Sequence, residues 1–515
     1  MTKEEIKNLL KKEAFPHKTN YLELKETYIS WLIFTGDFVY KIKKPVKYGY
    51  LDFSSLKKRE FFCKEELRLN QRLSKDIYLE VVKIVEKGKN LFFIPLKKSL
   101  SKGEKIKDYA LKMRQIPQEY CLFELIKKRK FKKEKIKNLA RKIALFHKMT
   151  ENCPKRYGWE VVKFNWQENF EQTKKFVGKI LNKALFGFIK KAIEKFLTEN
   201  KDLFFERIKQ EKIKDCHGDL HSGNIFITPD QIYIIDCIEF NKRFRYQDTA
   251  SDVAFLTMDL EYLKRKDLAK EFLKEYNLYL KDETLFEILP FYQCYRAYVR
   301  AKVGCFSLPK QDIFSIQNYF SLALKYAFLC LKKKPFLIIL FGPVGTGKSY
   351  LGKYLSKILG ASYLNSDVIR KKMFNIPLFE HPKENLDKIY NKKISLKVYQ
   401  KMINEGIKLA KEGNFVILDA TFPTQFYRQL LIEKAKKQKI PYFFVECWAS
   451  EKKILERLKK RETKKEVSDA TTKVYFKLKG KFEPFVLSKE NYLFLNREKD
   501  KVKEDANKIL KKVLA

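Results

Sequence analysis

The 515-residue chain lacks any long apolar run. The longest clean run, around 336–341, is far shorter than the roughly 20 residues that a membrane-spanning helix requires. The first residues, MTKEEIKNLLKKEAF, are charged, and they lack the apolar core and the cleavage site of a secretory signal. We therefore expect a folded cytoplasmic protein with no membrane partner.

The sequence also lacks paired cysteines. Nine cysteines, an odd number, are scattered without a CxxC pair. This pattern argues against a disulfide framework and against a zinc ribbon, so we interpret the cysteines as buried or unpaired thiols.

Acidic residues are few relative to basic ones, with Asp+Glu 63 against Lys+Arg 109 and a net charge of +46. Such a charge can attract nucleic acid through counterion release. The lysines and arginines, however, run along the whole chain. We favour the interpretation that they keep the helices soluble, and a polyanion-binding surface stays as the alternative.

The length predicts two to four domains, and neither a repeat nor a low-complexity linker marks their boundaries. One break is clear: a helical stretch at 321–331 ends in Lys332-Lys333-Lys334-Pro335, and the strand-like run PFLIILFG follows at once. We therefore predict one domain at 1–333 and a second at 334–515.

The first domain begins with a helix and continues as α+β. Strands are predicted at 28–34, 38–43, 79–85 and 91–96, and a helix at 54–73. The first two strands are joined by Thr35-Gly36-Asp37, which is a hairpin signal. From Cys121 onward the pattern is mostly helical. We expect an α+β lobe that leads into a helical lobe.

Two segments of the helical lobe carry chemistry. CHGDLHSGNIFI is followed by IYIIDCIEF, which places Asp219, Asn224 and Asp236 on a loop, a loop end and a strand end. Phosphoryl transfer needs one carboxylate that orients the attacking hydroxyl and oxygen ligands that hold magnesium. The Asp-x4-Asn spacing equals that of the protein-kinase catalytic loop. The alternatives are an ordinary turn and a zinc pair of His217 with His221, although Gly218 disfavours the helix that such a pair needs.

A phosphate-binding lysine is predicted on the strand at 38–43. Lys41 lies two residues after Val39, as the lysine of V-A-I-K follows its alanine, and alternation places Lys43 on the same strand face. We expect Lys41 to contact the α- and β-phosphates, with Lys43 as the alternative. Its acidic partner on the following helix should be Glu66, with Glu65 as runner-up.

HGDLHSGN together with IIDCIEF resembles the aminoglycoside and choline phosphotransferase branch of the kinase-like fold. The segments ETYISWLIFTGDFVYKIKKPVKYGYLDFSSLKKRE and RFRYQDTASDVAFLTMDL are similar to the first half of a bacterial two-domain family, in which such a domain precedes a P-loop ATPase. Over 20–330 the resemblance implies a two-lobed kinase-like domain, with Asp219 as base and Asn224 and Asp236 as magnesium ligands. It also implies a structural Asp252. Cys237 departs from the family pattern after the metal aspartate, and the fold names no substrate.

The second domain carries a phosphate-binding loop. GPVGTGKS fits G-x4-G-K-S between an apolar strand and a helical pattern at 350–359, which is the context that this motif requires. Its backbone N–H groups are expected to surround the phosphates of ATP. Lys348 should contact the β- and γ-oxygens, and Ser349 should bind magnesium. The predicted nucleotide-binding residues are Gly342, Gly345, Thr346, Gly347, Lys348 and Ser349.

Two further strands of this domain end in carboxylates. Asp367 precedes Arg370 by three residues, and Asp419 ends the strand in NFVILDATF. Strand C-termini line the ligand crevice of a doubly wound parallel sheet, so both aspartates should face the phosphates. Asp419 resembles a Walker B carboxylate that holds magnesium. The D-x-x-R and SDA signatures resemble gluconate, polynucleotide and zeta-toxin kinases, which implies Asp367 as base and Arg370 as substrate clamp; an ordinary strand-end turn is the alternative.

A lid is predicted downstream. Arg457 and Arg461 lie four residues apart on the helix ILERLKKRE, before the polar stretch SDATT, and this face could cover the γ-phosphate during catalysis. A solvated basic helix is the alternative.

Together these motifs predict an α+β kinase-like two-lobed domain followed by an α/β P-loop domain with a parallel sheet. We expect an ATP- and Mg²⁺-dependent phosphotransferase with two nucleotide sites, whose substrates are unidentified small molecules with a hydroxyl group. The alternatives are a nucleic-acid end kinase or nucleic-acid-binding ATPase, and a chain in which one half is a nucleotide sensor for the other.

Overall fold

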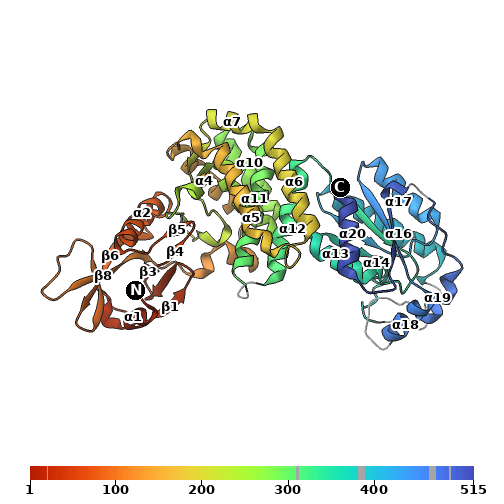
Figure 1. The fold of residues 1–515 in the computed structure, drawn as a ribbon, viewed down its shortest axis with the longest axis horizontal. Helices are drawn as coiled ribbons and strands as arrows, with labels where there is room; N and C mark the ends of the chain where they lie inside the picture. Colours follow the sequence, from red (N-terminus) through yellow and green to blue (C-terminus); the bar gives the residue numbers. More distant parts are fainter. Residues whose placement is uncertain (20, 309–311, 381–388, 463–470, 487–488, 515) are drawn as a thin grey trace. The chain divides into compact units, whose positions relative to one another are not determined.

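The computed structural model describes all residues except 20, 309–311, 381–388, 463–470, 487–488 and 515. The chain forms two compact units (Figure 1). The first unit combines Met1–Trp166 with Asn200–Arg296, and the second combines Gln167–Glu199 with Ala297–Ala515. The functional division at 333/334 stays a prediction.

An antiparallel six-stranded sheet with the order β1-β2-β3-β8-β6-β7 forms the N-terminal part of the first unit. Its strands are β1 (Glu23–Glu26), β2 (Ser30–Phe34), β3 (Phe38–Lys43), β6 (Tyr78–Lys87), β7 (Asn90–Pro95) and β8 (Lys105–Arg114). The long helix α2 (Leu56–Ser74) packs on β6 and β8, and α1 (Lys3–Asn8) lies at β7. Alternate strand residues form the core: Tyr40 and Ile84 pack in a cluster with Ile6 of α1, whereas Val81 and Leu111 pack with Cys63 of α2.

Helices make up most of the rest of the first unit. They are α3 (Leu122–Lys127), α4 (Lys135–Met149), α5 (Trp159–Thr173), α7 (Lys201–Lys209), α8 (Lys242–Arg245), α9 (Thr249–Tyr262), α10 (Lys266–Leu280) and α11 (Leu285–Phe306), of which α5 and α11 run on into the second unit. Short antiparallel pairs join β4 (Lys47–Tyr48) to β5 (Leu51–Asp52), β9 (Ile213–Asp215) to β12 (Tyr246–Asp248), and β10 (Ile225–Ile227) to β11 (Ile232–Ile234). The chain also forms short 3-10 turns: η1 (Lys12–Ala14), η2 (Gln118–Tyr120), η3 (Lys155–Tyr157), η4 (Lys174–Phe176), η5 (Ser222–Asn224) and η6 (Lys489–Asn491).

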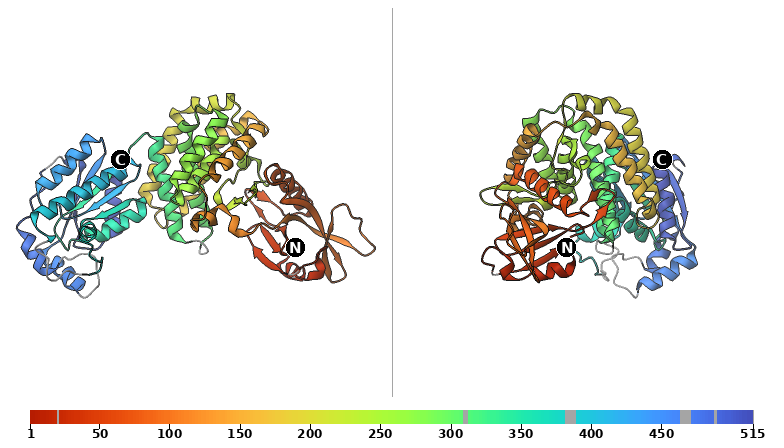
Figure 2. Two further views of the ribbon diagram at one scale, coloured as in Figure 1. Left: turned by 180° about the vertical axis from the view of Figure 1, so that it is seen from behind. Right: turned by 60° about the vertical axis from the view of Figure 1, so that its left-hand side comes forward.

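A parallel five-stranded sheet with the order β14-β15-β13-β16-β17 forms the centre of the second unit. Its strands are β13 (Leu337–Phe341), β14 (Ser362–Asn365), β15 (Val416–Asp419), β16 (Tyr442–Trp448) and β17 (Tyr492–Asn496). The helices are α6 (Lys183–Glu199), α12 (Ile313–Cys330), α13 (Lys348–Leu359), α14 (Ser366–Met373), α16 (Lys392–Lys411), α17 (Gln425–Lys437), α18 (Glu451–Glu462), α19 (Thr472–Lys479) and α20 (Val502–Val513). Figure 2 shows helices on both faces of this sheet. Because β13 lies between β15 and β16, its C-terminal end is the switch point at which such sheets bind ligands.

Two helices that precede the predicted boundary pack with the second unit. Helix α12 contacts α6 and α13, and α6 also contacts α20. The Phe328 ring of α12 stacks on Phe188 of α6 and lies edge-on to Phe336 and Phe415. The Ser321 hydroxyl donates to the carbonyl oxygen of Ile358 at the end of α13. These helices therefore belong to the core around the parallel sheet.

The predicted fold class is confirmed by the two sheets. In the part of the chain that the structure describes, no helix is both long enough and apolar enough to span a membrane.

Candidate functional site

A short hairpin positions two of the predicted metal ligands in the first unit. In the register of β10 and β11, Ile225 pairs with Ile234, and the Ile235 N–H donates to the carbonyl oxygen of Asn224. Asn224 immediately precedes β10, and Asp236 lies two residues after β11. The antiparallel pairing thus places both residues at one end of the hairpin.

The predicted base, Asp219, lies next to Asn224. The Asn224 Nδ2 donates to the Asp219 carbonyl oxygen and to its carboxylate Oδ2, each at 3.0 Å. The Asp219 side chain is 35% exposed, and the His221 Nε2 lies 3.5 Å from the same Oδ2. Because Nδ2 is turned toward Asp219, the Asn224 Oδ1 points to the other side of the amide and is available as an oxygen ligand.

The predicted lysine and helix glutamate meet at Asp236. The Lys41 Nζ lies 2.7 Å from Oε1 of the fully buried Glu66 and 2.5 Å from Oδ1 of Asp236. Burial alone would lower the pKa of Lys41, but Asp236 and Glu66 raise it well above its usual range. Glu65, the runner-up partner, pairs with Arg68 instead. Lys41 is therefore a permanent cation that joins strand β3, helix α2 and the end of the hairpin.

A second buried lysine lies beside this cluster, and the sequence interpretation missed one of its partners. The Lys43 Nζ lies 2.6 Å from Oε2 of Glu66 and also pairs with Glu239, which follows Asp236 by three residues. Burial raises the pKa of Glu239, and Lys43 opposes that rise. Only the acidic residue in the otherwise apolar segment CIEF could have pointed to Glu239. Lys43, the alternative phosphate ligand, is 1% exposed and lies deeper than Lys41, which is 14% exposed.

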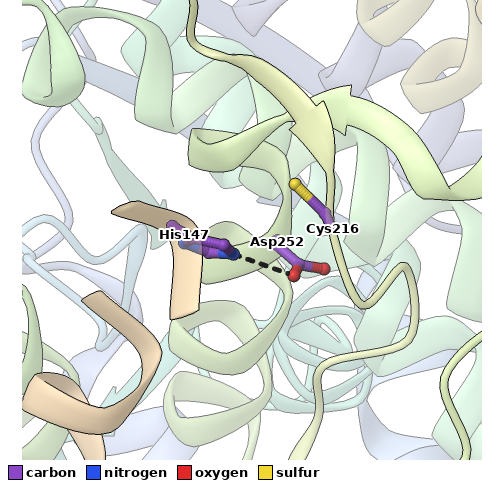
Figure 3. A group of neighbouring side chains, drawn as sticks. All are labelled: His147, Cys216 and Asp252. Atoms are coloured by element: carbon purple, nitrogen blue, oxygen red, sulfur yellow. Dashed lines mark hydrogen bonds and ion pairs between the residues drawn. The ribbon is translucent and has the colours of Figure 1, made fainter. Parts of the chain in front are cut away.

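Asp252, in the first turn of α9, holds the loop that carries Asp219. Its two carboxylate oxygens accept the backbone N–H groups of His217 and Gly218, each at 2.9 Å. Burial alone would raise the pKa of Asp252, but hydrogen bonding and charge from His147 lower it to about 2. Figure 3 shows the imidazole of His147 directed at this carboxylate, with Cys216 nearby. The ligand atoms of these three buried residues lie within 4.8 Å of one another. Burial raises the pKa of Cys216 well above its usual value, which favours the neutral thiol next to the Asp252 carboxylate.

His217 also helps to hold the loop that carries Asp219. Its Nε2 lies 3.0 Å from the carbonyl oxygen of Ile235, and its Nδ1 accepts the Asp219 N–H at 3.3 Å. The Nδ1 of His221 accepts the Gly223 N–H. The ring nitrogens of His217 are thus both used by the backbone, which leaves no ring nitrogen for the zinc pair considered from the sequence.

The GPVGTGKS loop joins β13 to α13. Gly342, Gly345 and Gly347 have φ of 130°, 79° and 86°, which residues with a Cβ rarely adopt. A Cβ on Gly342 would lie 2.3 Å from the carbonyl oxygen of Cys447, so the loop is pressed against β16. The Lys348 Nζ donates to the carbonyl oxygens of Gly342 and Pro343 at 2.8 and 2.7 Å. Burial lowers the pKa of Lys348.

Asp419 lies at the end of β15, next to the P-loop strand. Leu340 of β13 pairs with Asp419 in the parallel register. The Asp419 Oδ2 accepts hydrogen bonds from the Tyr363 hydroxyl at 2.5 Å and the Asn365 Nδ2 at 2.8 Å. The Tyr363 hydroxyl also hydrogen-bonds Ser349. Tyr363 thus connects the two predicted magnesium ligands of this unit.

The remaining predicted residues surround this edge of the sheet in different ways. Asp367 lies in the first turn of α14, and its N–H donates to the Asn365 Oδ1 at 3.0 Å. The Arg370 Nη1 donates to the carbonyl oxygen of Ile389 at 2.7 Å, and its guanidinium lies over the Tyr390 ring. The structure therefore packs Arg370 against the backbone and an aromatic ring, and its role as a substrate clamp stays a prediction.

The two predicted lid arginines lie on α18. The Arg457 Nη2 donates to the carbonyl oxygen of Arg497 at 2.7 Å and to Asp500 at 2.6 Å. Burial is the main cause of the lowered pKa of Lys348, and the charge of Arg461 lowers it further. In the predicted stretch SDATT, Ser468, Asp469 and Ala470 lie outside the described residues.

Arg497, which follows β17, was missed by the sequence interpretation. Its side chain is fully buried, and its Nε and Nη2 lie closest to the point where a Cβ on Gly347 would be, at 3.4 and 3.3 Å. Its place after an apolar strand end in NYLFLNR was the available signal, because strand C-termini line the crevice of such a sheet.

The chain is similar to one known protein family and to several known proteins. Residues 337–485 match the family described as AAA domain. Uncharacterized proteins of Mycobacterium tuberculosis and Mycobacterium bovis are 28% identical to this chain over 410 residues, which cover 78% of each sequence.

Among solved structures, an ADP-bound aminoglycoside phosphotransferase is 15% identical and covers 63% of this chain and 99% of its own, with a TM-score of 0.37. A gluconokinase of Sinorhizobium meliloti is 17% identical and covers 35% of this chain and 94% of its own, with a TM-score of 0.27.

Proposed function

We propose that this protein is an ATP-dependent phosphotransferase with two Mg²⁺-ATP sites, which transfers γ-phosphate to hydroxyl groups of small molecules. The observation that carries the proposal is the convergence of Lys41, Glu66 and Asp236 beside Asn224 and Asp219, because these groups come from four separate segments of the first unit. The complete P-loop of the second unit supplies the other site.

In the first unit, Lys41 would neutralise phosphate oxygens, and Asn224 and Asp236 would hold magnesium. The donor set fits this metal, since the amide and carboxylate supply hard oxygen ligands and the Asp236 side chain is 49% exposed. Magnesium would neutralise the charge that develops on the transferred phosphoryl group. Asp219 would accept the proton of the attacking hydroxyl, and its partly exposed carboxylate is open to a substrate.

In the second unit, Lys348 would bind the β- and γ-oxygens, and Ser349 and Asp419 would hold magnesium. Within the described part of the chain, the buried Lys348 Nζ donates to the carbonyl oxygens of Gly342 and Pro343 and to the Thr346 hydroxyl of its own loop, so these contacts can be exchanged for phosphate oxygens. Asp367 would serve as the base for the second acceptor. Arg457 and Arg461 would cover the phosphates from α18.

The test is the nucleotide stoichiometry of the full chain, measured by isothermal titration with a non-hydrolysable ATP analogue and Mg²⁺. We expect two sites in the wild type and one in either Asp236→Asn or Lys348→Ala. The double variant should bind none. Asp230→Asn, in the exposed turn of the same hairpin, and Lys353→Ala, on the exposed face of α13, are matched controls that should keep both sites. A wild-type stoichiometry of one would refute the two-site proposal and favour a degenerate half.

A radiolabel experiment identifies the acceptors. Incubation with γ-labelled ATP and a metabolite pool should yield labelled small molecules, and Asp219→Asn and Asp367→Asn should each remove a different set.

The net charge of +46 supports a second candidate, a kinase of nucleic-acid ends. Under the small-molecule proposal, random oligonucleotides should bind only non-specifically, with Kd of roughly 10⁻⁴ to 10⁻⁶ M at physiological salt. Tight, end-specific binding in an anisotropy titration would favour the end kinase.

A further inference from the structure

Arg497 is a buried cation whose charge is only partly matched by protein groups. It follows β17 directly, and its side chain has no exposed surface. Its Nη1 donates to the Asp505 carboxylate of α20 at 2.6 Å, whereas its Nε and Nη2 have no hydrogen-bond partner among the described residues. A guanidinium N–H that is buried without an acceptor is costly, because the group has lost its water without replacement.

The unpartnered atoms face the phosphate-binding loop. A Cβ built on Gly347 would lie 3.3 Å from the Arg497 Nη2 and 3.4 Å from its Nε, and 3.8 Å from the Arg457 Nη1. That Arg457 nitrogen is also buried and has no partner within the described part of the chain. Three N–H-bearing nitrogens of two arginines therefore converge on one glycine, at the start of α13.

This convergence requires an acceptor of negative charge. Two guanidinium groups beside each other repel, and the buried Lys348 lies next along the chain from Gly347. Asp505 and Asp500 each pair with one arginine, but through nitrogens other than the three that face the loop. The start of α13 adds its own positive end. A phosphate oxygen is the acceptor that matches a planar guanidinium fork in geometry and in charge.

We propose that Arg497 and Arg457 form an anion subsite at Gly347 that binds a phosphate group of the nucleotide in the P-loop. Asp505 orients the Arg497 fork toward the loop. This inference rests on the proposed nucleotide site of the second unit and names Arg497 as a phosphate ligand there.

The test compares two ligands, Mg²⁺-ATP and inorganic tripolyphosphate, which has the phosphates but no base. The measured quantity is the component of binding to the full chain that Lys348→Ala removes. Arg497→Met, Arg497→Lys and Arg457→Met should each weaken this component by roughly 10- to 100-fold for both ligands, as expected for charge-assisted hydrogen bonds. Arg497→Lys keeps the charge that Asp505 needs and loses the fork, so it serves if Arg497→Met does not fold.

The matched control is Arg428→Met. Arg428 is an equally buried arginine of the same unit; its Nε and Nη2 donate to the carbonyl oxygens of Thr424 and Glu483, and only its Nη1 has no hydrogen-bond partner among the described residues. This variant should lose stability and keep wild-type affinity for both ligands.

Three results would overturn the inference in distinguishable ways. Wild-type affinity in the folded Arg497 variants would remove Arg497 from the site and leave the nucleotide site standing. Weaker binding of ATP with unchanged binding of tripolyphosphate would assign Arg497 to the base instead of a phosphate. A wild type without any Lys348-dependent binding would refute the nucleotide site itself.

Discussion

The substitution Lys43→Met tests the buried charge cluster of the first unit. Lys43 lies between Glu66 and Glu239, and its Nζ is 2.6 Å from the nearer oxygen of Glu66. Methionine has a similar length and no charge, so it leaves Glu239 buried without its cation. Glu66 keeps Lys41, so the loss falls mainly on Glu239.

The loss of unfolding free energy in Lys43→Met depends on how deeply the ion pair is buried, because ion pairs of the same length differ in strength. The Lys64–Glu60 pair lies on α2, the helix that carries Glu66, and its two charged atoms are also 2.6 Å apart. Its side chains, however, are 52% and 29% exposed, compared with 1% and 0% for Lys43 and Glu66. Breaking a buried pair costs about 3–5 kcal/mol, whereas an exposed pair spaced i,i+4 contributes about 0.3–0.5 kcal/mol. Lys43→Met should therefore destabilise the first unit about tenfold more than Lys64→Met.

The stability that is lost in Lys43→Met should depend on pH. Because burial already raises the pKa of Glu239, loss of Lys43 should raise it further. The unpaired Glu239 carboxylate lowers the stability of the folded protein at neutral pH. This loss becomes smaller as the pH falls toward about 4.3, the ordinary pKa of a glutamate in the unfolded chain, because Glu239 of the folded protein is then protonated. The deficit of Lys43→Met should therefore shrink as the pH is lowered from 7 to 5.

Native-state hydrogen exchange of peptides from β3 and α2 measures the local stability of the first unit at each pH, and it does not assume that the whole chain unfolds together. A cost of about 3–5 kcal/mol corresponds to roughly two to four orders of magnitude in protection, at 1.36 kcal/mol per tenfold change. Lys43→Met/Glu239→Gln should recover much of that loss. A loss of protection no greater than that of Lys64→Met, or one independent of pH, would refute the reasoning.

Three further predictions concern single loops. Asp219→Asn in a Lys348→Ala background should reduce transfer of labelled γ-phosphate by about 10²- to 10⁴-fold while nucleotide binding persists, because the base is lost and the metal ligands remain; equal turnover would exclude Asp219 as base. Gly342→Ala should abolish the nucleotide-dependent thermal shift of the second unit, since its Cβ would clash with β16, whereas Gly480→Ala, with nothing within 4 Å, should keep that shift. Burial lowers the pKa of His217, so the first unit should lose stability as the pH falls below about 6.5, the ordinary value at which the unfolded chain takes up the proton; thermal melts of His217→Gln should show a flatter profile in this range.

Local patterns made much of the first site predictable. Strand alternation places Lys41 and Lys43 on one face, and the structure shows both at Glu66. The HGDLHSGN turn and the strand end at Asp236 meet because a hairpin joins them within a few residues. Strand β8, in contrast, was not predicted, although it lies at the centre of the first sheet. Its central position depends on pairing with distant strands, which local patterns do not record.

The second site shows the same limit. GPVGTGKS and the strand end at Asp419 could be predicted because both consist of consecutive residues with one required context. The position of Arg497 in the site could not be predicted, because it depends on contact with Gly347, which lies 150 residues earlier in the chain. Its place after the apolar strand NYLFLN is the one local signal, and one arginine among so many basic residues does not stand out by itself. Glu239 was missed for a similar reason, since only the burial of Lys43 makes it a partner.

The division of the chain has a consequence for its history and for its use in the laboratory. The polypeptide passes from one unit to the other three times, after Trp166, Glu199 and Arg296, and the first and last passages lie within α5 and α11. A gene cut at codon 333 would leave α6 and α12 on the N-terminal fragment and deprive α13 and α20 of the helices that cover them. We expect the two halves of the chain to be inherited and expressed together, and fragments that begin at 334 to aggregate through the uncovered aromatic surface at Phe336 and Phe415.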